Sequence, residues 1–294
     1  MLTSLTTGIG QVGSPDSDTW GNGAAAARLL VHNGVKILGC DLHLSSAERT
    51  KQRLLNERPE ASVNVFACDV TKPDEVKAFV AAAVDKHGRL DILVNNVGLT
   101  AAGSPETMSH ETWSRQIDIN LTSVYHLCQL VLPIMEQQRS GSIINNASIT
   151  AMRYIGKHQI AYASAKAGVV QFSKAMGVMY AKSNIRSVQI HFNKGERSRA
   201  LTRNAHCRCN CVVPGLMYTP LVENFAQSKD PGDQEAARRI KDHNVPMGWM
   251  GTGEDVANAV AWLASGASRY VTAHALVVDG GITQSTGTGF QAQE

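Results

Sequence analysis

Short apolar runs alternate along the chain with longer stretches in which apolar residues recur every three to four positions. A short apolar run bounded by polar residues is typical of a buried strand, and the longer spacing is typical of an amphipathic helix. We therefore expect strands near 2–6, 35–40, 63–68, 90–94, 141–147, 211–213 and 275–278, and helices that include 24–33, 74–87 and 163–181.

This alternation predicts an α/β fold, a doubly wound Rossmann-type parallel sheet with helices on both faces. Ligands of such sheets bind beyond the carboxyl ends of the strands. Polar side chains follow several of the expected strands at that end, namely Asp41, Asp69, Asn95, Asn96 and Ser148. The sequence therefore predicts a ligand site along one edge of the sheet.

Length and composition favour one domain over residues 1–294, because the chain has 294 residues of which 43% are hydrophobic. No apolar run reaches the ~18 residues that a membrane span needs. The first residues lack the basic segment and apolar core of a secretory signal. The six cysteines show no paired framework, which indicates reduced thiols. We expect a cytoplasmic protein that does not bind a membrane.

Cys207, Cys209 and Cys211 alternate as C-x-C-x-C. Zinc ligands are usually spaced as C-x2–4-C with a second pair elsewhere. A zinc site is therefore the weaker interpretation of these cysteines, and we expect no metal.

The formal net charge of +3 comes from one segment. Residues 187–209 contain five basic residues and one acidic residue, so the rest of the chain carries a net charge of −1. Nucleic-acid binding through this segment would predict a steep salt dependence. A basic surface is not a property of the whole chain, so we expect no nucleic-acid partner.

Several glycines lie near the N-terminus and precede a run of small residues at 24–27. Glycines at a strand-to-helix turn let a pyrophosphate approach the backbone and the helix N-terminus. A flexible loop is the alternative interpretation of such a cluster.

Asp41 ends the next expected strand, 18 residues after Gly23. An acid at this place can bind the ribose hydroxyls of an adenosine. Its neighbours are Cys40 and Leu42, so no adjacent Lys or Arg is present to bind a 2′-phosphate. We predict NAD rather than NADP as the cofactor, although an Asp after a strand is also a common helix cap.

Tyr162 and Lys166 lie four residues apart, one helical turn, on the same face of an expected helix. A tyrosine hydroxyl titrates near 10, so acting near neutral pH requires its pKa to fall by roughly 3 units. A neighbouring ammonium and a positive nicotinamide would stabilise the phenolate. Ser148 could hydrogen-bond a substrate oxygen near the tyrosine. Alternatively, Tyr162 and Lys166 lie on a solvated helix face and Ser148 caps a turn.

The ordered set of motifs resembles the short-chain dehydrogenase/reductase family, in its branch of single-domain short subunits. The likeness covers nearly the whole chain. It rests on Thr7-Gly8 with Gly21-Asn-Gly23, Asp69-Val70, Asn95-Asn-Val-Gly98, Asn120, Ser148, Tyr162-x-x-x-Lys166, Pro214-Gly215-x-x-x-Thr219-Pro220 and Asp279-Gly-Gly281.

The resemblance implies a role for each matching position. Gly8, Gly21 and Gly23 would form the glycine turn. Asp69 and Val70 would contact the adenine, and Asn95, Asn96 and Gly98 would shape the cofactor floor. Asn120 would hold a water of a proton relay, and Ser148 would orient the substrate oxygen. Tyr162 would transfer the proton, and Lys166 would bind the nicotinamide ribose and lower the tyrosine pKa. Thr219, after Pro214 and Gly215, would bind the nicotinamide carboxamide. The subunits would form a homo-oligomer, a tetramer or dimer, through the helices that carry Asn120 and Tyr162.

The chain departs from the family pattern in three places. Residues 11–19 interrupt the glycine motif as a polar, turn-rich insertion. Residues 187–209 separate Ile185-Arg186 from Asn210-Cys-Val-Val-Pro-Gly215, and this second insertion is either a surface loop or a retained intron. Ala273 stands where the family often has glycine, which requires the backbone there to avoid positive φ.

The leading functional prediction is an NAD(H)-dependent oxidoreductase that interconverts a secondary alcohol and a ketone. A lining that includes Met152, Tyr154, Met217, Met247 and Trp249 favours a neutral cyclic or aliphatic substrate. One alternative is an acyl-thioester ketoreductase that uses NADPH. Another is a catalytically impaired nucleotide-binding protein, because the two insertions lie in loops that deliver the cofactor.

Overall fold

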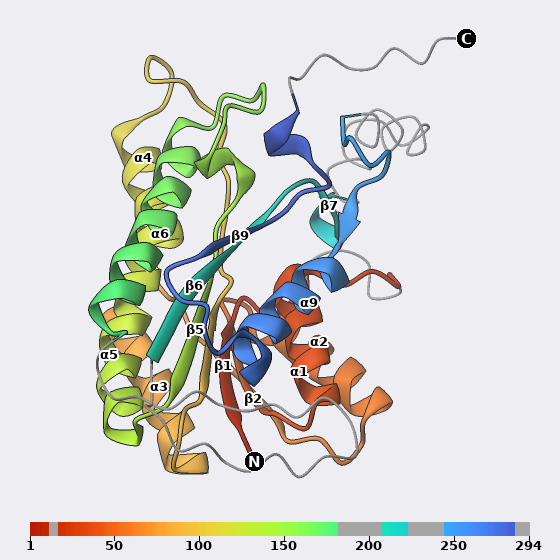
Figure 1. The fold of residues 1–294 in the computed structure, drawn as a ribbon, viewed down its shortest axis with the longest axis vertical. Coiled ribbons are helices and arrows are strands. Elements are labelled where there is room, and N and C mark those ends of the chain that lie inside the picture. Colours follow the sequence, from red (N-terminus) through yellow and green to blue (C-terminus); the bar gives the residue numbers. More distant parts are fainter. Residues whose placement is uncertain (12–16, 182–206, 223–243, 286–294) are drawn as a thin grey trace.

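The computed structural model describes residues 1–11, 17–181, 207–222 and 244–285, and its centre is a seven-stranded parallel sheet. The strand order is β3-β2-β1-β4-β5-β6-β9 (Figure 1). The strands are β1 (Thr3–Thr7), β2 (Lys36–Asp41), β3 (Val63–Ala67), β4 (Ile92–Asn95), β5 (Gly141–Asn146), β6 (Cys207–Pro214) and β9 (Ala275–Val278), with a separate pair β7 (Met217–Tyr218) and β8 (Gly251–Thr252).

Helices cover both faces of the sheet, so the predicted doubly wound fold is confirmed (Figure 1). On one face lie α3 (Pro73–His87), α4 (His110–Ile117), α5 (Ser123–Gln138) and α6 (Ile160–Met179). On the other lie α1 (Asn22–His32), α2 (Leu44–Glu57) and α9 (Gly253–Ala264). Within the described ranges, no helix is both long and apolar enough to cross a membrane.

Two hydrophobic cores account for the apolar runs in the strands. Leu93 and Ile143 belong to the core beneath α3, α5 and α6, whereas the neighbouring residues Val94 and Ile144 belong to the core beneath α1 and α9. Successive side chains of a strand point to opposite faces, so a strand covered on both faces is apolar throughout.

The strand β6 begins at Cys207, four residues before the start that the sequence predicts. Residues 207–209 therefore belong to this strand and not to the predicted insertion 187–209. Cys207, Arg208 and Cys209 pair with Gly141, Ser142 and Ile143 of β5. Three cysteines alternate here with two polar residues, so the segment lacks the apolar run of a buried strand. All three thiols nevertheless pack into one core. Residues 182–206 lie outside the described part of the chain.

Arg208 is the largest fully buried side chain of the described residues. Its Nη1 donates to Ser268 O at 3.2 Å and to Ser268 Oγ at 2.8 Å, and its Nη2 donates to Ser265 O at 3.2 Å. Burial lowers the pKa of Arg208 to about 10. The guanidinium therefore joins β6 to the carbonyls that follow the end of α9.

Ala273 has a φ of +57°, so the expectation that this position avoids positive φ is wrong. Its amide donates to Cys209 O at 2.8 Å, which fixes the turn before β9. An alanine held in the left-handed region costs about 1 kcal/mol. The hydrogen bond and the close packing of Gly177 against Ala273 hold the residue there.

Candidate active site

Tyr162, Lys166 and Ser148 meet at the carboxyl edge of the sheet. The Lys166 Nζ donates to Asn146 O at 2.8 Å and lies 5.7 Å from the centre of the Tyr162 ring. Ser148 lies two residues after the end of β5, and its side chain hydrogen-bonds Tyr162. The structure therefore brings together the three side chains that the sequence singles out for proton transfer.

Burial controls the charge of these groups. It raises the pKa of Tyr162 above the ordinary value, and the Ser148 hydrogen bond opposes that rise in part. Burial also lowers the pKa of Lys166 to about 8. The ammonium donates to a main-chain carbonyl, which carries no charge, so desolvation by burial favours the neutral amine. The lowering of the Tyr162 pKa that the sequence predicts is not present in the chain alone.

Asn120 lies in a π-helical turn (Asp118–Thr122) between α4 and α5 and is fully buried. Its Nδ2 donates to Leu99 O at 2.8 Å, and its Oδ1 accepts from Leu99 N at 3.1 Å. Such turns interrupt helices at functional positions. A side chain on Gly98 would lie 3.3 Å from Asn120 Oδ1 and 3.2 Å from Lys166 Nζ, so the glycine lets the two groups approach.

The glycine turn has the close contacts that a pyrophosphate site requires. Gly8 has a φ of +63°, and a side chain on Gly23 would collide with Gly8 O and the Asn96 amide. Gly21 precedes α1, and a side chain there would meet nothing within 4 Å. The first turn of α1 contains no acidic residue. An anion can therefore approach this helix N-terminus.

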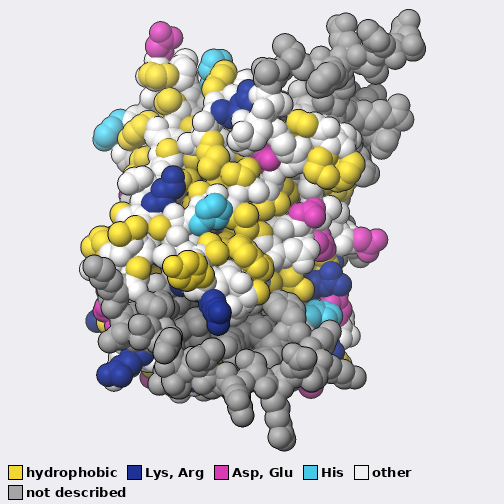
Figure 2. All heavy atoms as spheres, viewed as in Figure 1, with side chains coloured by type: hydrophobic (Ala, Val, Ile, Leu, Met, Phe, Trp, Pro, Cys, Tyr) yellow, Lys and Arg dark blue, Asp and Glu magenta, His cyan; other side chains and the backbone are white. Residues whose placement is uncertain are grey.

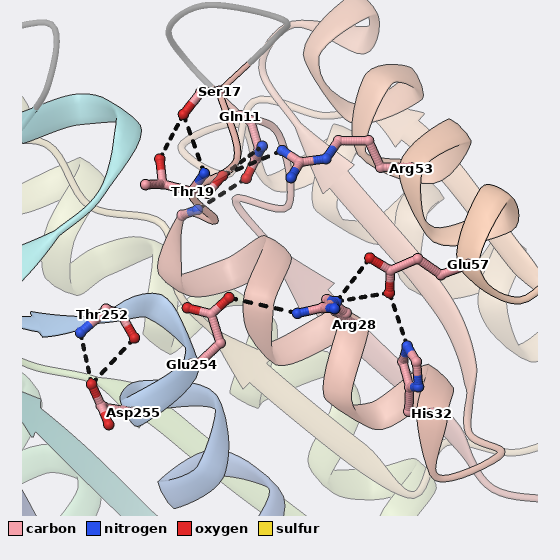
Figure 3. A network of polar contacts seen from close by, with 11 residues as sticks. Gln11, Ser17, Thr19, Arg28, His32, Arg53, Glu57, Thr252, Glu254 and Asp255 are labelled. Atoms are coloured by element: carbon pink, nitrogen blue, oxygen red, sulfur yellow. Dashed lines mark hydrogen bonds and ion pairs between the residues drawn. The ribbon is translucent and has the colours of Figure 1, made fainter.

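The two ends of the predicted insertion 11–19 are joined, which keeps the glycines in one turn (Figure 3). Gln11 Oε1 accepts from Gly21 N at 3.0 Å, and Arg53 Nη1 donates to Thr19 O at 3.3 Å. The Arg53 guanidinium also lies 3.8 Å from the centre of the buried Trp20 ring. Residues 12–16 of this insertion lie outside the described part of the chain.

Asp41 lies beside this turn at the end of β2. Its Oδ2 accepts from Gly10 N at 3.0 Å and its Oδ1 from His43 N at 3.2 Å. Each carboxylate oxygen can accept further hydrogen bonds, so the ribose hydroxyls of an adenosine fit here. The cap interpretation is also met in part, because His43 is the residue that precedes α2.

The remaining predicted cofactor residues divide into two groups. Asn96 follows the end of β4, Gly215 the end of β6 and Thr219 the end of β7, whereas Val70 is buried in the core beneath α3, α5 and α6. The Asp69 carboxylate instead accepts from Thr71 N at 2.9 Å and Thr71 Oγ1 at 2.7 Å. The Asn95 side chain points into the core and donates to Asn145 Oδ1 at 2.9 Å.

The loop after β6 begins where Pro214 ends the strand. Gly215 N donates to Val278 O at 2.8 Å, and a side chain on Gly215 would collide with Asp279. Thr219 is buried and follows β7. These contacts place the loop that carries Thr219 next to the end of β9.

Three residues at this edge, Thr7, Asn146 and Arg153, have no role predicted from the sequence. Thr7 Oγ1 accepts from Asn96 N at 3.0 Å and Val97 N at 3.3 Å. Asn146 contacts both Lys166 and Asn96. Arg153 Nη1 donates to Ile282 O at 2.6 Å and Ser285 O at 2.7 Å, which ties the loop after Ser148 to the chain after β9. A polar residue at the carboxyl end of a strand is the signal for Thr7 and Asn146, whereas nothing in the sequence pairs Arg153 with residues so distant.

A nicotinamide dinucleotide fits these residues. The open space at Gly21 and the conformation of Gly8 suit a pyrophosphate, and Asp41 suits a ribose. Asn146 Oδ1 is a buried acceptor without a hydrogen-bond partner among the described atoms. A buried acceptor of this kind favours a ligand that carries donors.

Buried cysteines, in contrast, form no metal site within the described ranges. No group of three or more His, Cys, Asp or Glu residues there could hold a metal ion. Burial raises the pKa of the Cys207 thiol to about 12 and that of Cys211 to about 11. The alternating thiols act as small apolar side chains in the core.

Comparisons with known proteins agree with this architecture. A family model described as short chain dehydrogenase matches residues 18–194, and one described as enoyl-(acyl carrier protein) reductase matches residues 197–283. A 3-oxoacyl-(acyl-carrier-protein) reductase of Thermotoga maritima is 31% identical over 262 residues, which cover 89% of this chain and 93% of that protein.

Two further similarities extend over almost the full length. The 3beta-hydroxysteroid dehydrogenase 1 of Eggerthella lenta is 35% identical over 272 residues, which cover 92% of this chain and 92% of that protein. The crystal structure of a short-chain dehydrogenase/reductase from Burkholderia xenovorans has a TM-score of 0.83 and 37% identity, and the match covers 97% of each chain.

Proposed function

The chain belongs to the short-chain dehydrogenase/reductase family, and from this premise we propose that it interconverts a secondary alcohol and its ketone with NAD(H), using Tyr162 as general acid and base. Relatives across the family are oxidoreductases that act on alcohol or keto groups, so the chain is an enzyme of that class. The contact of Tyr162 with Ser148 and Lys166 is the observation that carries the proposal.

Each of these side chains has a defined part in the reaction. The bound nicotinamide supplies or accepts the hydride. During reduction the Tyr162 hydroxyl donates its proton to the carbonyl oxygen, and Ser148 holds that oxygen by a hydrogen bond. During oxidation the Tyr162 oxygen takes the proton of the alcohol. Lys166 stabilises the phenolate that remains after proton donation.

The raised pKa of Tyr162 supports proton donation. The protonated hydroxyl is the form that can donate a proton to the ketone oxygen, and burial favours this neutral form. Oxidation needs the phenolate, which the positive charge of the oxidised nicotinamide would favour. Asn120, held by the Leu99 backbone, would keep the loop after β4 beside Lys166 and support a water-mediated proton relay.

NAD is the proposed cofactor because of the Asp41 carboxylate. A carboxylate binds ribose hydroxyls but repels a 2′-phosphate. The Arg49 guanidinium, which lies next to this turn, donates from Nη2 to Gln11 O at 2.8 Å and Ser46 Oγ at 3.1 Å. These bonds engage the basic group that could otherwise face a 2′-phosphate.

An NADPH-dependent ketoreductase of acyl thioesters is the second candidate. It is favoured by the similarity to the Thermotoga maritima reductase. A spectrophotometric screen of NADH and NADPH against ketones and acyl thioesters separates the two. We expect a higher kcat/KM with NADH, and a preference for NADPH above ~tenfold, about 1.4 kcal/mol, would reverse the assignment.

A neutral cyclic or aliphatic alcohol or ketone is the proposed substrate. Met152 and Tyr154 follow β5, Met247 and Trp249 directly precede β8, and all four residues are between 43% and 68% exposed. Such a lining supports an apolar substrate, and the similarity to a hydroxysteroid dehydrogenase is in keeping with it. Activity confined to charged substrates in the same screen would contradict it.

We further propose that the protein is a homo-oligomer. Tyr125 on α5 is 48% exposed. Hydrophobic side chains also gather on the face over β9, between α6 and α9 (Figure 2). Exposed apolar surface of this kind is typical of subunit interfaces. Light scattering should give a multiple of the subunit mass, and a monomer at micromolar concentration would refute the proposal.

A further inference from the structure

A chain of amide hydrogen bonds joins the glycine turn to the strand end that holds Lys166. Asn96 Nδ2 donates to Gly8 O at 3.0 Å, and Asn146 Nδ2 donates to Asn96 Oδ1 at 2.8 Å. The main-chain carbonyl of Asn146 accepts the Lys166 ammonium at 2.8 Å. Asn146 therefore contacts the glycine turn through its side chain and Lys166 through its backbone.

We call the hydrogen bonds that join Gly8, Asn96 and Asn146 the amide relay. The direction of each bond in it follows from Gly8. Gly8 O is a carbonyl and can only accept, so the Asn96 amide presents its NH2 group to Gly8 and its oxygen to Asn146. Asn146 must then present its own NH2 group to Asn96. An Asp or an apolar residue at position 146 would have no proton to donate.

Strand alternation explains why Asn146, and not its neighbour, takes this position. Asn145 points to the opposite face of β5, where Nδ2 donates to Ser173 Oγ at 2.8 Å and Oδ1 accepts from Asn95 at 2.9 Å. Asn145 is fully buried in that core. Asn146 ends the strand and points toward the glycine turn.

The same chain of hydrogen bonds also fixes a left-handed turn at Gly8. Gly8 has a φ of +63°, and its carbonyl also contacts Gly23 at the start of α1. The Asn96 amide is therefore the group that orients the peptide between β1 and the pyrophosphate site. Without the Asn146 donor, the oxygen of the half-buried Asn96 side chain would lose its partner, and the amide would be free to rotate away from Gly8.

We propose that Asn146 is a positioning residue that sets the affinity of the glycine turn for the dinucleotide, acting through Asn96. This inference rests on the proposed function, because it assigns the turn to a nicotinamide cofactor. Asn146 does not take part in hydride or proton transfer. Its effect should therefore fall on cofactor binding.

Two substitutions separate this role from a structural one. Asn146→Asp keeps the shape of the side chain but removes the donor, and Asn146→Ala removes the amide. We expect NADH titrated by fluorescence to bind about tenfold more weakly to either variant, since an acceptor is left unsatisfied. The loss should fall on the Kd and KM of the cofactor rather than on kcat, because the Lys166 acceptor is main chain. Asn56→Ala on the exposed face of α2 is the matched control.

A double-mutant cycle tests the relay itself. Asn96→Ala and the double variant with Asn146→Ala should weaken NADH binding to the same extent, since both break one chain of bonds. Additive losses would overturn the proposal, and so would a lower melting temperature with unchanged Kd. Failure of the wild-type protein to bind either NADH or NADPH would refute the proposed function, whereas equal binding by wild type and Asn146→Ala would refute only the role of Asn146.

Discussion

The spacing of Tyr162 and Lys166 can be predicted from the sequence, but the burial of these side chains cannot. Spacing alone places Tyr162 and Lys166 on one helix face, but it does not show that Lys166 is 2% exposed. It also does not show that the ammonium donates to Asn146 O. A carbonyl compensates desolvation less than a carboxylate does, so the pKa of Lys166 falls to about 8. The chemistry of the pair therefore depends on burial, which arises from the fold.

The pKa of Lys166 makes stability depend on pH in a defined direction. Between about 8 and its ordinary value of 10.5, the unfolded chain binds a proton that the folded chain has released. Stability therefore rises with pH across this window. Urea unfolding of the cofactor-free protein should show a gain of ~1–2 kcal/mol over Lys166→Met between about pH 7.5 and 9.5. Parallel pH profiles for the two proteins would contradict the burial of this ammonium.

Most elements of the sheet are predictable, because both faces of each strand are covered and the runs are apolar. The start of β6 is not, since Arg208 and Asn210 alternate with cysteines and the segment directly follows a basic stretch. Its place in the core becomes clear only from the pairing with β5 and from the carbonyls of Ser265 and Ser268. Ala273 likewise needs the observed turn to show its positive φ.

Arg208 gives a test of this strand. Arg208→Ala would leave the carbonyls of Ser265 and Ser268 without their donors and open a cavity between β6 and the end of α9. We expect the free energy of unfolding to fall by about 3 kcal/mol. Chemical denaturation measures this, with the exposed Arg269→Ala as the control. Equal stability of the two variants would show that the guanidinium does not hold the strand.

At the scale of the whole molecule, several polar residues that the sequence singles out lie at one edge of the sheet. Asp41, Asn96 and Ser148 come from three different strand ends and meet there because the strands are parallel. Sequence reasoning does not find the contacts between distant segments, such as those of Arg153 with the chain after β9. Gln11, which joins the two ends of the first insertion, is another such contact. The Gln11 contact explains how the glycine turn forms despite the added residues.

Steady-state NAD(H) turnover by wild type and Tyr162→Phe tests the central claim most directly. The substitution removes only the hydroxyl that Ser148 contacts, so the fold and the glycine turn should remain. We predict that kcat falls at least ~100-fold while NADH still binds, because the proton donor and acceptor is lost. Turnover near the wild-type rate in Tyr162→Phe would contradict the assignment of Tyr162 as the general acid and base.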